Sequence, residues 1–170
     1  LYFRGSLHNV LQRYIDTAKK FKIDQIVRIT ADNPLVDIRF LKKSLPFFEE
    51  YEYVDAIYPG GLIKGTGFEL VSLSELQGIP SPEKEYQEHV TLWLREHLHE
   101  NDKRVSLRPT DENRFRKDLF LSCDFTSDLD LLREIFKYYD YRTDISIKEV
   151  TELFEMKPAL VNLNLKLHRG

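Results

Sequence analysis

Hydrophobic residues recur at three- and four-residue steps along several stretches of the chain, which is the spacing of an amphipathic helix. Together with capping residues, this spacing predicts helices over residues 7–20, 37–51, 83–100 and 129–139. Asp37 stands at the N-cap of the second of these helices, and Ser72 caps another that begins at residue 73. Ser146 and Glu149 have the spacing of a capping box, which predicts a last helix that ends near residue 155.

Shorter apolar runs, several of them rich in β-branched residues, predict strands over residues 24–30, 53–58, 68–70, 105–107 and 119–123. Helices and strands mostly alternate, and a stretch in the middle of the chain has the pattern of inserted antiparallel strands. This order predicts an α/β fold with three layers, α/β/α, whose sheet carries a β insertion.

Composition narrows the classes of protein. A chain of 170 residues with 42% hydrophobic content is long enough to bury one core, so we expect one domain. A net charge of -3 argues against a general nucleic-acid binder and leaves room for a small anionic ligand. The single cysteine, Cys123, excludes a disulfide framework between cysteines of this chain and fits a reducing compartment. No apolar run is long enough to cross a bilayer, so we predict no membrane association and a cytoplasmic location.

Two aspartates follow apolar strands and precede a turn and a helix. They are Asp32, after residues 24–30, and Asp124, after residues 119–123. Ligands of α/β sheets gather at the carboxyl ends of the strands, where two carboxylates could hold Mg²⁺ together with phosphate oxygens. The alternative is that both aspartates only cap loops and helices.

Other polar residues are weaker candidates. Arg28 lies within the strand that leads to Asp32, where an arginine usually pairs with a carboxylate or a phosphate. Glu69 lies in a strand beside glycines, and Glu88 and His89 form a pair that could contact a sugar or a carboxylate. The run of residues 101–104, by contrast, has the composition of a solvated loop.

Five segments resemble, in order, the motifs of a known family. They are LYFRGSLHNVLQRY (1–14), IVRITADNPLVD (26–37), FELVS (68–72), EHVT (88–91) and CDFTSDLDLLREI (123–135). The family is that of the spore coat polysaccharide type cytidylyltransferases, which are related to the CMP-KDO and CMP-acylneuraminate synthetases. The resemblance covers nearly the whole chain and implies a Rossmann-like fold of the nucleotide-diphospho-sugar transferase type, with a mixed sheet.

The resemblance also implies an activity, in which a sugar hydroxyl attacks the α-phosphorus of CTP and a CMP-sugar and pyrophosphate form. By this likeness, Asp32 and Asp124 would be the catalytic aspartates and would bind Mg²⁺. The remaining site residues follow from the same likeness: Arg13, Ala31 and Asp32 toward the nucleotide, and Arg28, Glu69, Glu88 and His89 toward the sugar. Ala31 stands where the family usually has glycine, and its methyl group would narrow the nucleotide pocket.

Members of this family begin with a strand and a Gly/Arg/Lys-rich loop around the triphosphate, and no segment here resembles that loop. We therefore expect a domain that is incomplete at its N-terminus and inactive alone. Because the related synthetases pair through the corresponding region, the resemblance also implies a dimer formed through an insertion over residues 59–109. The alternative function is that of a non-catalytic domain that keeps the fold for dimerisation or partner binding. A nucleotidyltransferase that uses another base, such as uridine, is a third hypothesis.

Overall fold

The computed structural model describes residues 1–56, 62–80, 83–109, 116–165 and 168. The backbone forms two compact units. Unit 1 consists of Leu1–Arg28, Leu45–Asp55 and Glu69–Ser106, and unit 2 of Ile29–Ser44, Ala56–Phe68 and Leu107–Gly170. The single domain with an insertion over residues 59–109 stays a prediction, and residues 59–61 and 81–82 of that insertion lie outside the described part.

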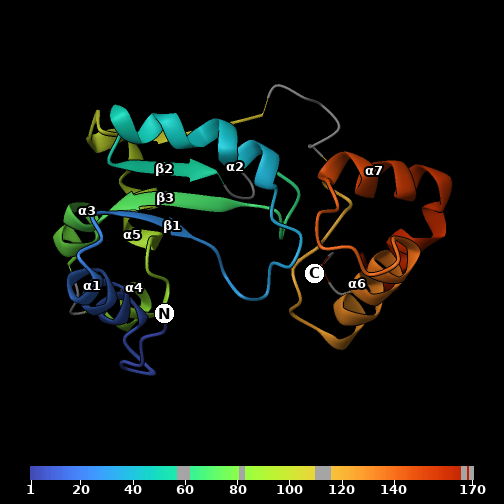
Figure 1. Ribbon diagram of the computed structural model, residues 1–170, viewed down its shortest axis with the longest axis horizontal. Coiled ribbons are helices and arrows are strands. Elements are labelled where there is room, and N and C mark those ends of the chain that lie inside the picture. The colour runs from blue at the N-terminus through green and yellow to red at the C-terminus, as the bar shows by residue number, and fades with distance from the viewer. Residues whose placement is uncertain (57–61, 81–82, 110–115, 166–167, 169–170) are drawn as a thin grey trace. The chain divides into compact units, whose positions relative to one another are not determined.

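Unit 1 contains most of a four-stranded sheet of order β1-β3-β2-β4. The strands are β1 (Gln25–Arg28), β2 (Tyr53–Ala56), β3 (Phe68–Ser72) and β4 (Arg104–Ser106). Figure 1 shows β3 between β1 and β2. Strand β1 pairs with β3 antiparallel and β2 pairs with β4 parallel, so the sheet is mixed, as predicted. Residues 57–58 of the predicted strand 53–58 lie outside the described residues.

Strand β1 is at one end of this sheet, and no strand of the described residues lies beyond it. The N–H of Leu73 donates to the carbonyl of Asp24 at 2.8 Å. Because bonded and non-bonded pairs alternate in an antiparallel ladder, the peptide groups of Gln25 and Val27 point away from β3. The side chain of Val27 is 40% exposed. Within the described part of the chain, no strand pairs with these outward peptide groups, and the apolar side chain of Val27 is exposed beside them.

Short helices complete unit 1. They are α1 (Val10–Phe21), α3 (Leu73–Gly78), α4 (Lys84–Glu88), α5 (Leu92–Glu96), and the 3₁₀ helices η1 (Leu45–Glu49) and η2 (Leu98–Glu100). The other helices of unit 1, without η1, bury one apolar core with the sheet, which includes Leu11, Ile15, Tyr53, Val71, Leu76 and Leu94. The Ser72 hydroxyl accepts a hydrogen bond from the N–H of Glu75 at 3.1 Å, which confirms the predicted cap of α3.

The predicted helix over residues 83–100 is wrong, because this stretch forms α4, α5 and η2 in succession. The chain leaves helical geometry between α4 and α5, at His89 and Thr91. Val90 and Thr91 are β-branched and each is only 1% exposed. Branched side chains are poor helix formers, and burying both in unit 1 favours the break over a continuous helix.

Unit 2 is mainly helical. Its elements are α2 (Ile38–Ser44), α6 (Thr126–Tyr138), α7 (Ile147–Met156) and the 3₁₀ helix η4 (Pro158–Leu163). The predicted cap of α2 is confirmed, because Asp37 Oδ1 accepts a hydrogen bond from the N–H of Phe40 at 2.9 Å. The helix predicted to reach residue 51 changes from α to 3₁₀ geometry at Leu45. Pro46 explains this change, because proline has no N–H to continue the α-helical pattern.

The core of unit 2 gathers around α6 and α7. It includes Leu35, Ile63, Leu119, Leu121, Leu131, Ile135, Val150, Leu153 and Phe154. The strand predicted over residues 119–123 is wrong, because the segment makes only an isolated bridge, between Phe120 and Lys64. The partner segment turns at Gly65, whose φ is +91°, so the ladder ends after one pair. The apolar pattern is that of a buried extended segment.

The capping box of α7 is confirmed. The N–H of Glu149 donates to the Ser146 hydroxyl at 3.3 Å, and the Glu149 carboxylate accepts from the N–H of Ser146 at 2.8 Å. The hydrogen bonds from the Ser146 hydroxyl and N–H, followed by the bond from Arg142, lower the pKa of Glu149 to about 2. The ionised carboxylate is therefore part of the cap.

We expect Ser146→Ala to lower the free energy of unfolding by about 1 kcal/mol at neutral pH.

The contribution of Glu149 to the free energy of unfolding is present above the pKa of an ordinary glutamate and is lost as the pH falls toward 2. The stability difference between the wild type and Glu149→Gln should accordingly shrink over this range in urea titrations. A difference that stays constant from pH 6 to pH 2 would contradict the capping role.

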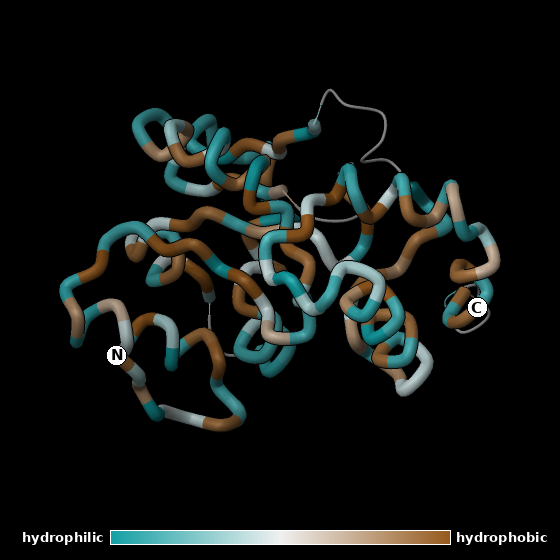
Figure 2. The backbone as a smooth tube through the Cα atoms, turned by 45° about the vertical axis from the view of Figure 1, so that its right-hand side comes forward, coloured by the Kyte–Doolittle hydropathy of each residue, from teal (hydrophilic) through white to brown (hydrophobic). Residues whose placement is uncertain are grey.

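Hydrophobic and polar residues are interspersed along the described part of the backbone, as Figure 2 shows by the mixing of brown and teal. Consistent with this pattern, none of the helices in the described part of the chain has the length and apolar character to cross a membrane.

Candidate functional site

Asp32 lies in the turn that follows β1, where the sequence places it. The turn is closed by the N–H of Asn33, which donates to the carbonyl of Thr30 at 3.1 Å. The carbonyl of Asp32 accepts a hydrogen bond from the N–H of Cys123 at 2.8 Å. Both segments belong to unit 2. The backbone therefore brings the residue before Asp124 directly against Asp32.

Asp124 is a partly exposed carboxylate with two hydrogen-bonding partners. Its Oδ2 accepts from Lys64 Nζ and from the Ser122 hydroxyl, each at 2.9 Å. The Asp124 side chain remains 35% exposed. Burial raises the pKa of this group, but the bonds from Lys64 and Ser122 lower it by more, so the pKa is below its ordinary value. Asp124 is thus ionised at neutral pH and faces a cation.

Lys64 is a site residue that the sequence analysis missed. It contacts Asp124 from 60 positions away in the chain, a pairing that no local pattern reveals. The available signal was its position directly before Gly65, in a Lys-Gly-Thr-Gly run. A lysine next to a glycine in a glycine-rich segment is typical of loops that contact anions.

Asp128 organises the turn that carries Asp124. Its side chain is fully buried and lies in the first turn of α6. Its Oδ2 accepts from the N–H groups of Asp124 and Phe125, at 3.0 and 2.8 Å. Its Oδ1 accepts from Asn164 Nδ2 at 2.8 Å and His168 Nε2 at 2.9 Å. Burial raises the pKa of Asp128, but these four bonds lower it by more.

The donor atoms of Asp124, Asp128 and His168 lie within 4.8 Å of one another, close enough to suggest a metal centre. Both oxygens of Asp128 are already used in four hydrogen bonds, however, and His168 Nε2 is used in one of them. Asp124 is the member of this group with an accessible carboxylate. Together with the exposed Asp32, it offers the hard oxygen donors that Mg²⁺ prefers.

In unit 1, the structure brings together Arg28 and Glu69, which the sequence assigned to the sugar side. They are cross-strand partners in β1 and β3 and form an ion pair. The Tyr53 hydroxyl donates to the same Glu69 carboxylate at 2.7 Å. Burial, followed by the charge of Glu69, raises the pKa of Tyr53 well above its ordinary value. Glu69 is 1% exposed and Arg28 18%, so Arg28 is the member that reaches solvent.

Arg13 lies on α1, where its Nη1 donates to the carbonyl of Ser6 at 3.1 Å. It lines a cavity of about 460 Å³ in unit 1, together with residues of β1. Ala31 lies in unit 2, exposed in the turn beside Asp32.

Glu88 and His89 are at the end of α4, and both are exposed. The N–H of His89 donates to the carbonyl of Glu85 at 2.8 Å. Glu88 lines a second cavity of unit 1, of about 330 Å³, with His8 and Lys84. Arg13 and Glu88 therefore line different cavities.

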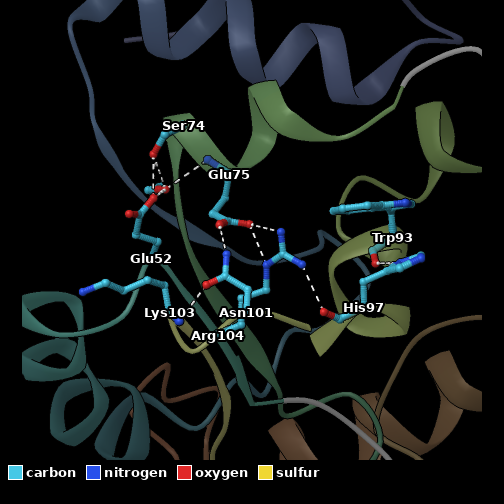
Figure 3. Close-up of polar contacts among 9 residues, drawn as sticks. Glu52, Ser74, Glu75, Trp93, His97, Asn101, Lys103 and Arg104 are labelled. Carbon is cyan, nitrogen blue, oxygen red and sulfur yellow. Dashed lines mark hydrogen bonds and ion pairs between the residues drawn. The ribbon is translucent and has the colours of Figure 1, made fainter. Parts of the chain in front are cut away.

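A further polar cluster in unit 1 is centred on Glu75 (Figure 3). Its carboxylate accepts from Arg104 Nε at 2.8 Å and from Asn101 Nδ2 at 3.3 Å. Arg104 also donates to the carbonyl of His97 at 3.0 Å and lies 5.0 Å from the centre of the Trp93 ring. The solvated-loop interpretation of residues 101–104 is wrong for Arg104, whose side chain is 9% exposed. Glu75, 29 positions away, could not be identified from sequence as its partner.

The sequence model of the cytidylyltransferase family matches residues 1–161. This chain belongs to the cytidylyltransferase family. The match covers nearly the whole chain and confirms the resemblance noted in its motifs.

Two curated relatives of this cytidylyltransferase chain are similar in sequence. An uncharacterized protein of Methanocaldococcus jannaschii is 29% identical over 164 residues, which cover 95% of this chain and 66% of the relative. The spore coat polysaccharide biosynthesis protein SpsF of Bacillus subtilis is 30% identical over 161 residues, which cover 92% of this chain and 65% of SpsF. The chain thus spans just under two thirds of the length of these relatives.

A solved structure is also similar, that of a cytidylyltransferase from Leptospira borgpetersenii. The TM-score is 0.84 at 25% identity, and the likeness covers 94% of this chain and 67% of that one. This neighbour confirms the predicted fold class for our cytidylyltransferase chain, a nucleotide-diphospho-sugar transferase-like α/β fold with a mixed sheet.

Proposed function

We propose that this chain carries the metal-binding part of an enzyme that transfers CMP from CTP to an acidic or modified sugar. In this reaction a sugar hydroxyl attacks the α-phosphorus, the bond to pyrophosphate breaks, and a CMP-sugar forms. Membership of the cytidylyltransferase family supports the reaction, and the similarity to SpsF supports a product used for surface polysaccharide or glycan. The observation that carries the proposal is the hydrogen bond that ties the Asp32 turn to the Asp124 segment.

Asp32 and Asp124 are proposed to hold Mg²⁺. Both hydrogen bonds to the Asp124 carboxylate go to Oδ2, so among the described residues Oδ1 keeps its lone pairs for a cation. The ion pair of Asp124 with the Lys64 ammonium supports the proposal of a cation at this carboxylate. When bound, the metal would neutralise the charge that develops on the phosphate oxygens and orient them. The Lys64 ammonium, which binds Oδ2, would lie beside this metal, where its charge would attract a phosphate.

The other expected site residues complete the proposal. Arg13 and Ala31 are proposed to face the nucleotide, while Glu88 and His89 are proposed to face the sugar. Glu69 is buried and already bound, so we propose that it acts by holding Arg28, whose partly exposed guanidinium would contact an anionic group of the sugar.

We expect this chain to bind Mn²⁺ as a substitute for Mg²⁺, and to bind CTP in the presence of Mg²⁺ in a calorimetric titration. Asp32→Ala/Asp124→Ala removes both proposed ligands, so affinity for Mn²⁺, measured by electron paramagnetic resonance, should fall at least about tenfold. Lys64→Gln removes the ammonium that competes with the metal for Asp124, so it should increase the affinity for Mn²⁺.

Asp130→Ala is a suitable control, because Asp130 lies on α6 with its side chain 58% exposed and pairs only loosely with Arg133, at 3.5 Å. This variant should bind Mn²⁺ as the wild type does. The proposal fails if the folded wild type does not bind Mn²⁺, or if the double variant binds it equally well. UTP that competes with CTP at equal affinity would favour the hypothesis of another base.

A further inference from the structure

The turn that carries Asp124 is attached to residues near the C-terminal end of the chain. Asn164 Nδ2 donates both to the carbonyl of Phe120 and to Asp128 Oδ1, at 2.8 Å each. Asn164 is 2% exposed. His168 Nε2 donates to the same Oδ1 at 2.9 Å, and the His168 side chain is 5% exposed. Two buried side chains thus bind one oxygen of Asp128.

The other oxygen of Asp128 binds the turn itself. Oδ2 accepts from the N–H groups of Asp124 and Phe125. A carboxylate is planar and rigid, so the bonds made by Oδ1 determine where Oδ2 lies. The orientation of the Asp124 peptide group therefore depends on Asn164 and His168, although neither touches the Asp124 side chain through a described hydrogen bond.

The ring of His168 makes a second connection to the same site. It stacks on Phe120, with ring centroids 4.4 Å apart and an interplanar angle of 6°. The Lys64 ammonium lies 5.9 Å from the centre of the Phe120 ring and binds Asp124 at 2.9 Å. His168 is thus linked to Asp124 through Asp128 and, by way of Phe120, to the cation that pairs with Asp124.

From these contacts we infer that Asn164 and His168 are positioning residues, which orient the Asp124 carboxylate for its cation by fixing Asp128. The inference rests on the proposed function, in which Asp124 is a metal ligand. Partners in the outer shell of a metal ligand commonly affect metal affinity about 10- to 100-fold when they are removed.

The test compares two substitutions at His168. His168→Phe keeps an aromatic ring against Phe120 and removes the hydrogen bond to Asp128, whereas His168→Gln keeps a donor. We expect His168→Phe to speed amide hydrogen exchange of Asp124 and Phe125, and to weaken Mn²⁺ binding about tenfold. In His168→Gln, the amide exchange of Asp124 and Phe125 and the affinity for Mn²⁺ should stay close to those of the wild type. Asn164→Leu, which removes both donors, should behave like His168→Phe.

Two further measurements separate positioning from general stability. Exchange at Ile135 and Val150, buried in α6 and α7, reports loosening of unit 2 as a whole and should change little in His168→Phe. His99→Phe, at an exposed histidine of η2 in unit 1, is the control substitution and should leave Mn²⁺ affinity unchanged.

The inference is overturned if His168→Phe binds Mn²⁺ with wild-type affinity, or if exchange at Asp124 and Phe125 does not change. Equal acceleration at Ile135 and Val150 also overturns it, because His168 would then be a general structural contact. Should the wild type itself not bind Mn²⁺, the proposed function fails. The exchange rates of the two amides then decide by themselves whether Asn164 and His168 order the turn.

Discussion

Gly65→Ala is expected to lower the free energy of unfolding by about 3 kcal/mol or more. A Cβ atom at this position would lie 2.1 Å from the peptide nitrogen of Ser122 and 2.3 Å from the carbonyl carbon of Leu121. Both are backbone atoms, which cannot rotate aside as a side chain can. The φ of +91° adds strain for any residue with a side chain.

The same substitution should disturb the candidate site, because the segment that it pushes leads directly into Asp124. We expect loss of the Lys64–Asp124 ion pair together with the loss of stability. Urea unfolding followed by circular dichroism measures the stability change, and Mn²⁺ binding measures the change at the site.

Gly78→Ala is the matched control for this prediction. A Cβ at Gly78, the last residue of α3, would meet nothing within 4 Å. Alanine should therefore stabilise the protein there by about 0.4–1 kcal/mol, since it restricts the unfolded chain. If Gly65→Ala and Gly78→Ala have the same stability, the close approach of Gly65 to the Leu121–Ser122 backbone is wrong.

Glu69→Ala should be destabilising by about 3–5 kcal/mol, the usual cost of removing one member of a buried ion pair. It would leave the Arg28 guanidinium without its carboxylate and the Tyr53 hydroxyl, in a fully buried side chain, without its acceptor. Tyr53→Phe removes one hydrogen bond and should cost only about 1 kcal/mol. Chemical denaturation of the three proteins under identical conditions provides the comparison.

A double substitution tests the cause of the Glu69 effect. Arg28→Met/Glu69→Leu removes both charges and fills a similar volume, so it should recover the part of the stability lost in Glu69→Ala that comes from the unpaired Arg28 charge. The Tyr53 hydroxyl still lacks its acceptor in this variant. If the double variant loses as much free energy of unfolding as Arg28→Met and Glu69→Leu lose together, the loss comes from packing and the ion-pair explanation is wrong.

Features specified by residues close in the chain were predictable from the sequence. The caps formed by Asp37, Ser72 and Ser146 were found correctly, because each side chain binds a backbone N–H three residues away. Strand β1 was predictable from its β-branched residues, and the placement of Asp32 at its end followed from the same run.

Features that depend on distant contacts were not predictable. The helix predicted over residues 83–100 is interrupted where Val90 and Thr91 are buried. Their burial depends on contacts with the rest of the core, which the helical spacing of hydrophobic residues does not reveal. Residues 119–123 have the apolar composition of a strand, but Gly65 turns their partner away after one bridge. Lys64 and His168 reach the Asp124 turn from 60 and more than 40 positions away, so no local pattern could reveal that they contact it.

The outer edge of β1, with which no other strand of the described residues pairs, affects how this chain associates with other strands. Among the described residues, no strand pairs with the outward peptide groups of Val27, whose side chain is apolar and exposed. The strand Gln25–Arg28 contains no proline, lysine or bulge that would discourage a new strand. The same edge can receive a strand from another part of a larger polypeptide or the equivalent edge of a second copy. The first outcome extends a single folded sheet and the second joins molecules. A higher protein concentration favours pairing between two molecules, whereas a covalent link to the incoming strand favours pairing within one molecule. Folding and self-association therefore compete for the same edge of β1.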